Sequence, residues 1–257
     1  MKLLDIVTCA RPVLFANDNP EYPFSVGGTT FIVKFRGRSF VVTAKHVLNL
    51  KNFTAGQFAI QYRPDRRDFL PLGALHLARG ANEEDTDQYD IAVREINGAA
   101  VREELYGPYL PYSLLQMDRL TLFSERGAYI YRGYPTAMRE VDFENHQVEQ
   151  GAVTTRAEYV ARTRYEALHE LRLLDLGSLP SIDGLSGAPV FQVHNEDGTQ
   201  YSREAFAGMV LRGSIESGRI FMIEHRRIIE ALTQIAEGPN LWLDPRFPIT
   251  LEANTGS

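Results

Sequence analysis

The sequence contains a single cysteine, Cys9, so no disulfide can form within the chain. A chain without disulfides fits a reducing compartment, and we expect a cytoplasmic protein. The sequence also has no apolar run long enough to cross a bilayer as a helix. The short apolar stretch at its start carries Asp5, which the apolar core of a secretion signal would exclude. We therefore expect no membrane partner.

An excess of positive charge is also missing. The chain has 27 Lys and Arg against 33 Asp and Glu, a net charge of −6 at neutral pH. This balance argues against non-specific nucleic-acid binding and against a basic membrane-binding face. The hydrophobic fraction of 44% and charged fraction of 23% are those of a globular protein. The length of 257 residues suffices for one large domain or two small ones.

Short runs of β-branched and aromatic residues predict an all-β first half. Residues 29–35 and 39–44 flank an Arg-Gly-Arg turn and predict a β-hairpin. Residues 57–63 and 69–77 predict further strands. Residues 11–25 are rich in Pro, Asn and Asp, and this composition predicts an irregular segment.

A second strand-rich half follows a stretch rich in Gly and Pro, residues 97–119, which predicts an inter-domain connection. We assign residues 1–110 to an N-terminal β-barrel and residues 111–257 to a C-terminal one. Residues 157–174 have a composition that would also suit an amphipathic helix, but the surrounding pattern favours strands. Apolar spacing over residues 224–236 predicts a C-terminal helix. The clearer strand signals of this half lie at 127–135, 188–193, 205–213 and 219–223.

Three polar residues stand at the ends of predicted strands. His46 follows the strand 39–44, at the start of a short helical turn, and Asp90 directly precedes the apolar run Ile91-Ala92-Val93. Ser186 lies in the glycine-rich run Asp183 to Val190, which suits a tight turn with inward-pointing backbone N–H groups. Each residue alone has an ordinary explanation, as a structural histidine, a strand-start aspartate or a loop serine.

Together these residue types suit nucleophilic catalysis. A serine hydroxyl needs a neighbouring base to accept its proton, and histidine titrates near neutrality. A carboxylate can fix the histidine tautomer and stabilise the imidazolium. His46 and Asp90 lie in the first half and Ser186 in the second, so a cleft between two barrels would unite them. This order is the reverse of the Ser, Asp, His order of α/β-hydrolases.

Several segments resemble the trypsin/chymotrypsin-like serine peptidases, in particular their intracellular or bacterial branch. Residues 40–47, Phe-Val-Val-Thr-Ala-Lys-His-Val, are similar to the family's strand and Thr-Ala-x-His motif, and residues 89–93 resemble its Asp-Ile-Ala-Leu motif. Residues 183–190 resemble its Gly-x-Ser-Gly-Gly-Pro motif, and residues 208–213 resemble the strand that lines the substrate. The resemblance spans roughly residues 26–236.

The resemblance implies a chymotrypsin-like fold, with two six-stranded antiparallel β-barrels and the active site between them. It implies that His46 is the general base and acid, that Asp90 orients it, and that Ser186 is the nucleophile of a serine endopeptidase. The backbone N–H groups of Gly184 and Ser186 would bind the oxyanion. No metal or organic cofactor is implied. Other residues would contact a protein or peptide substrate, partly by strand addition: Asp183, Leu211, Arg212 and Gly213.

The sequence departs from the digestive members of the family at Leu185. Those enzymes carry an aspartate there, which pairs with a freshly cleaved N-terminus. Val26-Gly27-Gly28 superficially resembles such a terminus but lies too close to His46, and it fits better as the start of a strand. We therefore expect control by a regulatory protein partner or by loop ordering, and not by N-terminal cleavage.

Three residues near the expected site bear on substrate preference: Pro180, Asp183 and Arg212. The resemblance implies that Pro180 falls near the base of the primary pocket, which argues against a preference for Lys or Arg. Asp183 at the rim could favour a basic group, whereas Arg212 could attract an acidic group or be a solvated strand arginine. Lys45 stands before His46, where the digestive members of the family carry a small residue. It leaves open the alternative of a catalytically silent, peptidase-like binding or scaffold module.

Overall fold

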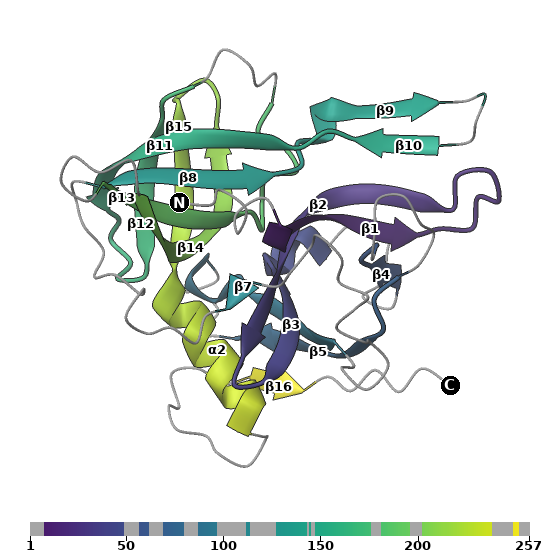
Figure 1. The fold of residues 1–257 in the computed structure, drawn as a ribbon, viewed down its shortest axis with the longest axis horizontal. Coiled ribbons are helices and arrows are strands. Elements are labelled where there is room, and N and C mark those ends of the chain that lie inside the picture. Colours follow the sequence, from purple (N-terminus) through teal and green to yellow (C-terminus); the bar gives the residue numbers. More distant parts are fainter. Residues whose placement is uncertain are drawn as a thin grey trace.

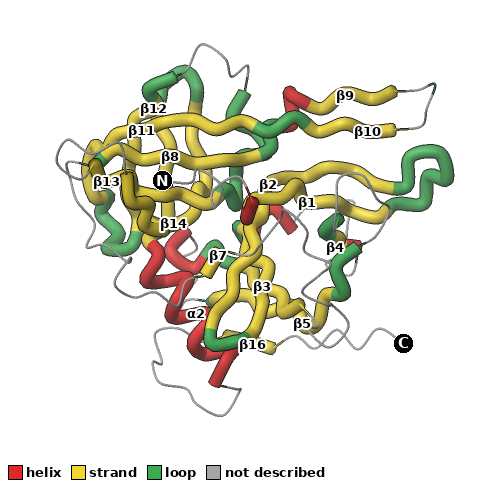
Figure 2. The backbone as a smooth tube through the Cα atoms, viewed as in Figure 1, coloured by secondary structure: helices red, strands yellow, loops and turns green. Residues whose placement is uncertain are grey.

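The chain is built from two β-sheet assemblies and a C-terminal helix, α2 (His225–Glu237) (Figure 1; Figure 2). A computed structural model describes residues 8–48, 57–61, 69–79, 87–96, 112–113, 127–142, 144, 147–175, 181–195, 202–237 and 249–251. Strands dominate this part of the chain, so the all-β prediction and the predicted C-terminal helix are confirmed.

The first assembly is a curled, open sheet of eight strands, in the order β16-β5-β6-β3-β2-β1-β4, with β7 pairing parallel to β2. Its long β1–β2 and β2–β3 hairpins are antiparallel. A turn of 3₁₀ helix, η1 (Lys45–Leu48), follows β3. The strands are β1 (Ala10–Ala16), β2 (Phe24–Phe35), β3 (Arg38–Thr43), β4 (Phe58–Ala59), β5 (Leu72–Ala78), β6 (Ala92–Ile96), β7 (Tyr112–Ser113) and β16 (Ile249–Leu251).

The second assembly is a closed six-stranded barrel, in which β11-β12-β15-β14-β13-β8 are neighbours and β8 pairs again with β11. A hairpin of β9 (Arg139–Asp142) and β10 (Gln147–Gln150) projects from it, after the 3₁₀ turn η6 (Thr136–Met138) (Figure 1). The barrel strands are β8 (Ala128–Gly133), β11 (Val153–Arg162), β12 (Leu168–Leu173), β13 (Pro189–Asn195), β14 (Ser202–Ser214) and β15 (Arg219–Glu224).

Most strand predictions are confirmed, including strands rather than a helix over much of residues 157–174. The prediction of an irregular segment at residues 11–25 is wrong, because β1 occupies the first part of this range. Pro12 is tolerated there because the short β4 pairs only with Leu14 and Phe15, so one edge of β1 is free of ladder bonds at Pro12 among the described residues. Of the predicted strand at 57–63, the structure describes residues 57–61, which contain β4 and a bridge at Gln61.

The two assemblies are not built from two uninterrupted halves of the chain. β7 pairs with β2 and β16 pairs with β5, although both segments lie within residues 111–257. The rest of the expected connection, 97–111 and 114–119, falls outside the described residues.

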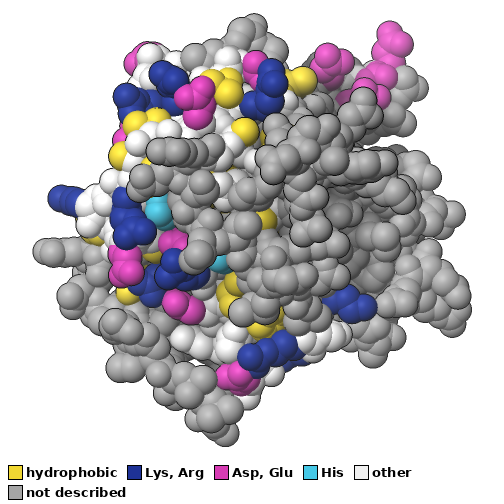
Figure 3. Space-filling view, turned by 60° about the vertical axis from the view of Figure 1, so that its left-hand side comes forward, with side chains coloured by type: hydrophobic (Ala, Val, Ile, Leu, Met, Phe, Trp, Pro, Cys, Tyr) yellow, Lys and Arg dark blue, Asp and Glu magenta, His cyan; other side chains and the backbone are white. Residues whose placement is uncertain are grey.

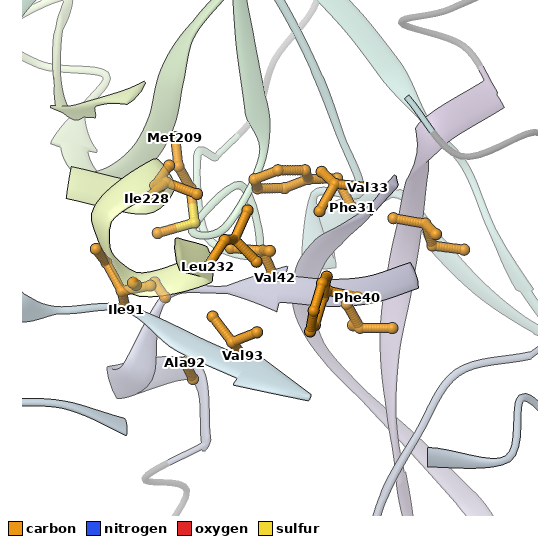
Figure 4. Packing of buried hydrophobic residues seen from close by; sticks show 14 of the residues in the cluster. Phe31, Val33, Phe40, Val42, Ile91, Ala92, Val93, Met209, Ile228 and Leu232 are labelled. Atoms are coloured by element: carbon orange, nitrogen blue, oxygen red, sulfur yellow. The ribbon is translucent and has the colours of Figure 1, made fainter. Parts of the chain in front are cut away.

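One hydrophobic core joins both assemblies through α2. Ile228 and Leu232 of α2 are fully buried among Val42, Ile91 and Met209, which come from both assemblies (Figure 4). A second buried cluster fills the closed barrel, with Tyr129, Tyr131, Leu171, Val190 and Met222 among its members. Because α2 packs on both assemblies, it fixes their relative position, and the candidate site lies between them.

Candidate active site

Strand pairing brings His46 and Asp90 together. β3 leads into η1, which carries His46, and Asp90 directly precedes β6. β3 and β6 are antiparallel neighbours, with Thr43 opposite Ala92, so the end of one strand meets the start of the other. The Lys45 N–H donates to the Asp90 carbonyl at 3.3 Å and closes this junction.

Asp90 binds His46 with both carboxylate oxygens. The backbone N–H of His46 donates to Oδ1 at 2.8 Å, and the ring Nδ1 pairs with Oδ2. An ionised carboxylate only accepts, so this pairing assigns the proton to Nδ1 and leaves Nε2 as the acceptor in the neutral ring. The Asp90 side chain is only 12% exposed while that of His46 is 45% exposed, so the ring can reach an external group.

The Ser186 turn requires its glycines. Gly184 and Gly187 have φ angles of +90° and +89°, in the left-handed region that glycine favours. A Cβ at Gly184 would lie 2.5 Å from the Tyr134 carbonyl oxygen, and one at Gly187 would lie 2.0 Å from the Thr29 oxygen. The run Gly-Leu-Ser-Gly is therefore dictated by backbone geometry and by close packing.

Thr29 of β2 ties this turn to the first sheet. Its hydroxyl donates to the Gly184 carbonyl at 2.7 Å, and its N–H donates to the Ser186 carbonyl at 3.0 Å. The Tyr134 N–H donates to the same hydroxyl at 2.9 Å. The sequence shows Thr29 only as a β-branched strand residue, so its role in holding the serine turn was missed.

Val47, the residue after His46, and the backbone of Ser186 both approach Gly28. A Cβ at Gly28 would lie 2.8 Å from the side chain of Val47, the residue after His46, and 3.5 Å from the Ser186 carbonyl oxygen. The absence of a side chain at Gly28 thus lets the two segments approach. The structure brings Ser186, His46 and Asp90 to one place between the assemblies.

Two N–H groups of the serine turn have no acceptor within the described chain, those of Gly184 and Ser186. Every neighbouring N–H is bonded: Asp183 to Ser181 Oγ, Leu185 to the Ile182 carbonyl, Gly187 to the Val210 carbonyl and Ala188 to the Leu185 carbonyl. Two N–H groups that lie beside a serine and have no acceptor are the donors that a developing oxyanion needs. They are the same two N–H groups that the resemblance implies for the oxyanion site.

The Ser186 hydroxyl donates to the carbonyl of Leu211 in β14, with an Oγ–O distance of 2.6 Å. Within the described residues no hydrogen bond joins it to the His46 ring. The hydroxyl would have to leave the Leu211 carbonyl before it could give a proton to His46. Catalytic hydrogen bonds are often absent in unliganded sites and form with substrate.

The remaining expected residues border this place. Asp183 is exposed, Leu211 is buried, and Arg212 is exposed and paired with Asp87. Gly213 is packed so closely against β15 that a Cβ would lie 2.4 Å from the Arg219 carbonyl oxygen. Pro180 lies outside the described residues.

The structure describes three features that the comparison with the peptidase family singled out. Leu185 is 1% exposed in the barrel core, against Gly133. Val26 to Gly28 lie inside β2, where Val26 pairs with Leu14 and Gly28 with Val13. Lys45 Nζ donates to the Ala78 carbonyl at 3.3 Å.

In the described ranges, no group of His, Cys, Asp and Glu side chains is arranged to hold a metal ion. No helix in that same part of the chain is long and apolar enough to span a membrane. A scan against known protein families and a search of curated protein sequences found no match to this chain.

Proposed function

We propose that this chain is a serine endopeptidase that hydrolyses peptide bonds through an acyl-enzyme on Ser186. The observation that carries the proposal is the combination of the Asp90–His46 pair with the two unused N–H groups beside Ser186. These supply a base, its orienting carboxylate, a nucleophile and an oxyanion site in one place. One closed barrel beside a curled sheet supports the finer assignment of a chymotrypsin-like architecture.

In the proposed reaction, Ser186 Oγ turns from Leu211 towards His46, whose Nε2 takes the hydroxyl proton as Oγ attacks the substrate carbonyl carbon. The oxygen of that carbonyl becomes negative and accepts from the N–H groups of Gly184 and Ser186. His46 then gives its proton to the leaving amine. A water molecule hydrolyses the ester with His46 again as base, and Asp90 remains ionised throughout.

The proposed substrate is a protein or peptide whose backbone pairs along Leu211, Arg212 and Gly213 of β14, with Asp183 at the rim of the site. Extended peptides commonly bind in this way, by adding a strand. The buried Leu185 and the paired Val26 to Gly28 support control by a regulatory partner or by loop ordering, and not by a newly cleaved N-terminus. A cytoplasmic location belongs to the same proposal.

A second candidate function is a catalytically silent binding or scaffold module. The hydrogen bond from the Ser186 hydroxyl to the Leu211 carbonyl favours it, because in that position the hydroxyl is not activated by a base.

Labelling with a fluorophosphonate separates the two candidates. We expect the wild-type chain to be labelled at Ser186, as mapped by mass spectrometry, and Ser186→Ala and His46→Ala to lose the label. Ser217→Ala is the matched control, since Ser217 is an exposed turn serine whose hydroxyl also donates to a carbonyl, that of Ser214 at 3.2 Å. Labelling that survives Ser186→Ala excludes this nucleophile. A wild-type chain that resists the probe and cleaves no peptide library favours the silent module.

A further inference from the structure

The turn that carries Asp90 is held by an arginine from the closed barrel. Asp87, Gln88 and Tyr89 form one turn of 3₁₀ helix directly before Asp90, whose N–H donates to the Asp87 carbonyl at 3.4 Å. Arg212 of β14 makes an ion pair with the Asp87 carboxylate through Nη2 and Oδ2. The pair therefore joins the assembly that carries Asp90 and His46 to the one that carries Ser186.

The neighbouring residue of β14 contacts the serine. The register between β14 and β15 shifts between Val210 and Arg212, which makes Leu211 the extra residue of a β-bulge. Its carbonyl accepts the Ser186 hydroxyl at 2.6 Å. Consecutive residues at this bulge therefore make the two contacts. Leu211 accepts from Ser186, and Arg212 pairs with Asp87 in the turn before Asp90.

Arginines hold both ends of the Asp87–Tyr89 turn. The Arg212 guanidinium lies 5.6 Å from the ring centroid of Phe221, its cross-strand partner in β15, which limits where it can point. At the other end, the Arg227 guanidinium of α2 lies 5.7 Å from the Tyr89 ring centroid. On the face shown in Figure 3, basic and acidic side chains interleave beside histidine.

We propose that Arg212 is a positioning residue: through Asp87 it sets the place of the Asp90–His46 pair relative to Ser186. This inference rests on the proposed peptidase function. The two side chains are 62% and 29% exposed, so the pair contributes little to folding stability. Its effect lies in alignment, because a misplacement of about 1 Å at a reacting centre can cost on the order of 10²-fold in rate. Exposure also makes the contact sensitive to salt.

The test compares single and double variants of the pair. Arg212→Gln and Asp87→Asn should each lower kcat about tenfold, with KM and Tm nearly unchanged, because the substrate contacts and the core stay intact. The reversed pair, Asp87→Arg with Arg212→Asp, should recover most of the loss. The matched control is Arg172→Gln, which breaks an exposed ion pair with Glu158 across β11 and β12, at 60% and 44% exposure.

Two further readouts would not respond to a merely structural contact. Raising the salt concentration from about 0.05 M to about 0.5 M should lower the kcat of the wild type but not that of Arg212→Gln. The downfield NMR signal of the proton between His46 Nδ1 and Asp90 should weaken in Arg212→Gln and return in the reversed pair.

The results separate this inference from the proposed function. A rise in KM with unchanged kcat overturns it, since Arg212 would then contact substrate directly. Equal losses in the single and reversed variants, with no recovery of rate or signal, also overturn it. If the wild type turns over no peptide, the peptidase proposal fails. The NMR signal still decides whether Arg212 positions the Asp90–His46 pair.

Discussion

Asp90 holds His46 at two points, with one carboxylate oxygen on the backbone N–H and the other on the ring Nδ1. The hydrogen bond from the backbone N–H, at 2.8 Å, fixes the position of the His46 backbone. The contact at Nδ1 fixes the orientation of the imidazole ring. A single buried carboxylate therefore determines both the position and the tautomer of the proposed base.

Asp90→Asn separates these two effects. The amide oxygen can still accept from the His46 N–H, so the fold should survive with a nearly unchanged Tm. The amide nitrogen cannot accept from Nδ1, so the ring takes the wrong tautomer, and kcat should fall by about 10³- to 10⁴-fold. Steady-state kinetics on a cleaved peptide and thermal unfolding measure both quantities.

The control for that variant is Asp175→Asn, an exposed aspartate paired with Arg156 far along the barrel. It should leave both kcat and Tm unchanged. A full rate with Asp90→Asn would mean that this carboxylate does not orient the base.

Gly184 gives a test of the serine turn. Gly184→Ala puts a Cβ within 2.5 Å of the Tyr134 carbonyl oxygen and 2.8 Å of the Thr136 nitrogen, at a φ of +90°. Both strain and crowding should destabilise the protein, by about 2–4 kcal/mol, and displace the proposed oxyanion donors. Urea unfolding and the rate of fluorophosphonate labelling report the two losses.

Gly37→Ala is the matched control, because Gly37 has a similar φ of +78° but nothing within 4 Å of the added Cβ. It should cost only the backbone strain, about 1 kcal/mol, and leave labelling unchanged. Equal effects of the two variants would show that packing around the serine turn is unimportant.

The candidate site residues could be selected from the sequence because they lie at strand ends and in a turn with strong local signals. His46 follows a clear strand, Asp90 precedes another, and Ser186 lies in a turn that only glycines permit. Thr29 could not be found this way. Its hydroxyl acts on Gly184, 155 positions away, and such a contact leaves no trace in local composition.

The parts of the fold that escaped prediction depend on long-range pairing. β16 is a short segment in a stretch with several prolines, and it becomes a strand because β5 offers an edge. β1 contains Pro12 and forms because β2 pairs along its whole length. Hydrogen bonding to a neighbouring strand can therefore form a strand even where the local sequence has a low β-strand propensity.

Leu185 is a buried residue of the closed barrel, and a charge at this position should not be tolerated. Leu185→Asp would bury a carboxylate in the apolar barrel core, where the wild-type side chain is 1% exposed, and should destabilise the protein by about 3 kcal/mol or more. Leu174→Asp is the control, since Leu174 is 44% exposed, and its effect should stay within about 0.5 kcal/mol. Denaturant unfolding measures both.

In the wild-type protein, an added N-terminal extension should not change the rate of fluorophosphonate labelling, because the buried Leu185 side chain has no charge that could pair with a new N-terminus. Labelling that appears only after proteolytic removal of the extension would contradict control without N-terminal cleavage.

Arg38 links β3 to the end of α2, and its contribution should depend on pH. Its guanidinium pairs with both oxygens of Glu95 and donates to the carbonyls of Ile235 at 3.1 Å and Ala236 at 3.3 Å. Cations at a helix C-terminus are favourable, so Arg38→Gln should lower the free energy of unfolding by about 1 kcal/mol at neutral pH, given that both partners are about one-third exposed.

The hydrogen bonds from Arg38 lower the pKa of the Glu95 carboxyl below its ordinary value of 4.5, against an opposing effect of burial, while the nearby His76 acts in the same direction as Arg38. A carboxyl with a lowered pKa in the folded state stabilises the fold above its unfolded pKa and loses this contribution as pH falls through the folded value. The difference between wild type and Arg38→Gln should therefore be largest near neutrality and shrink below pH 4.5.

Urea unfolding at a series of pH values measures this difference. Arg36→Gln breaks the ion pair with Glu237 at the same end of α2, where the arginine side chain is 47% exposed, and should change the free energy of unfolding only slightly. If the free energies of unfolding of wild type and Arg38→Gln differ by the same amount at every pH, Glu95 is not the group whose charge Arg38 stabilises.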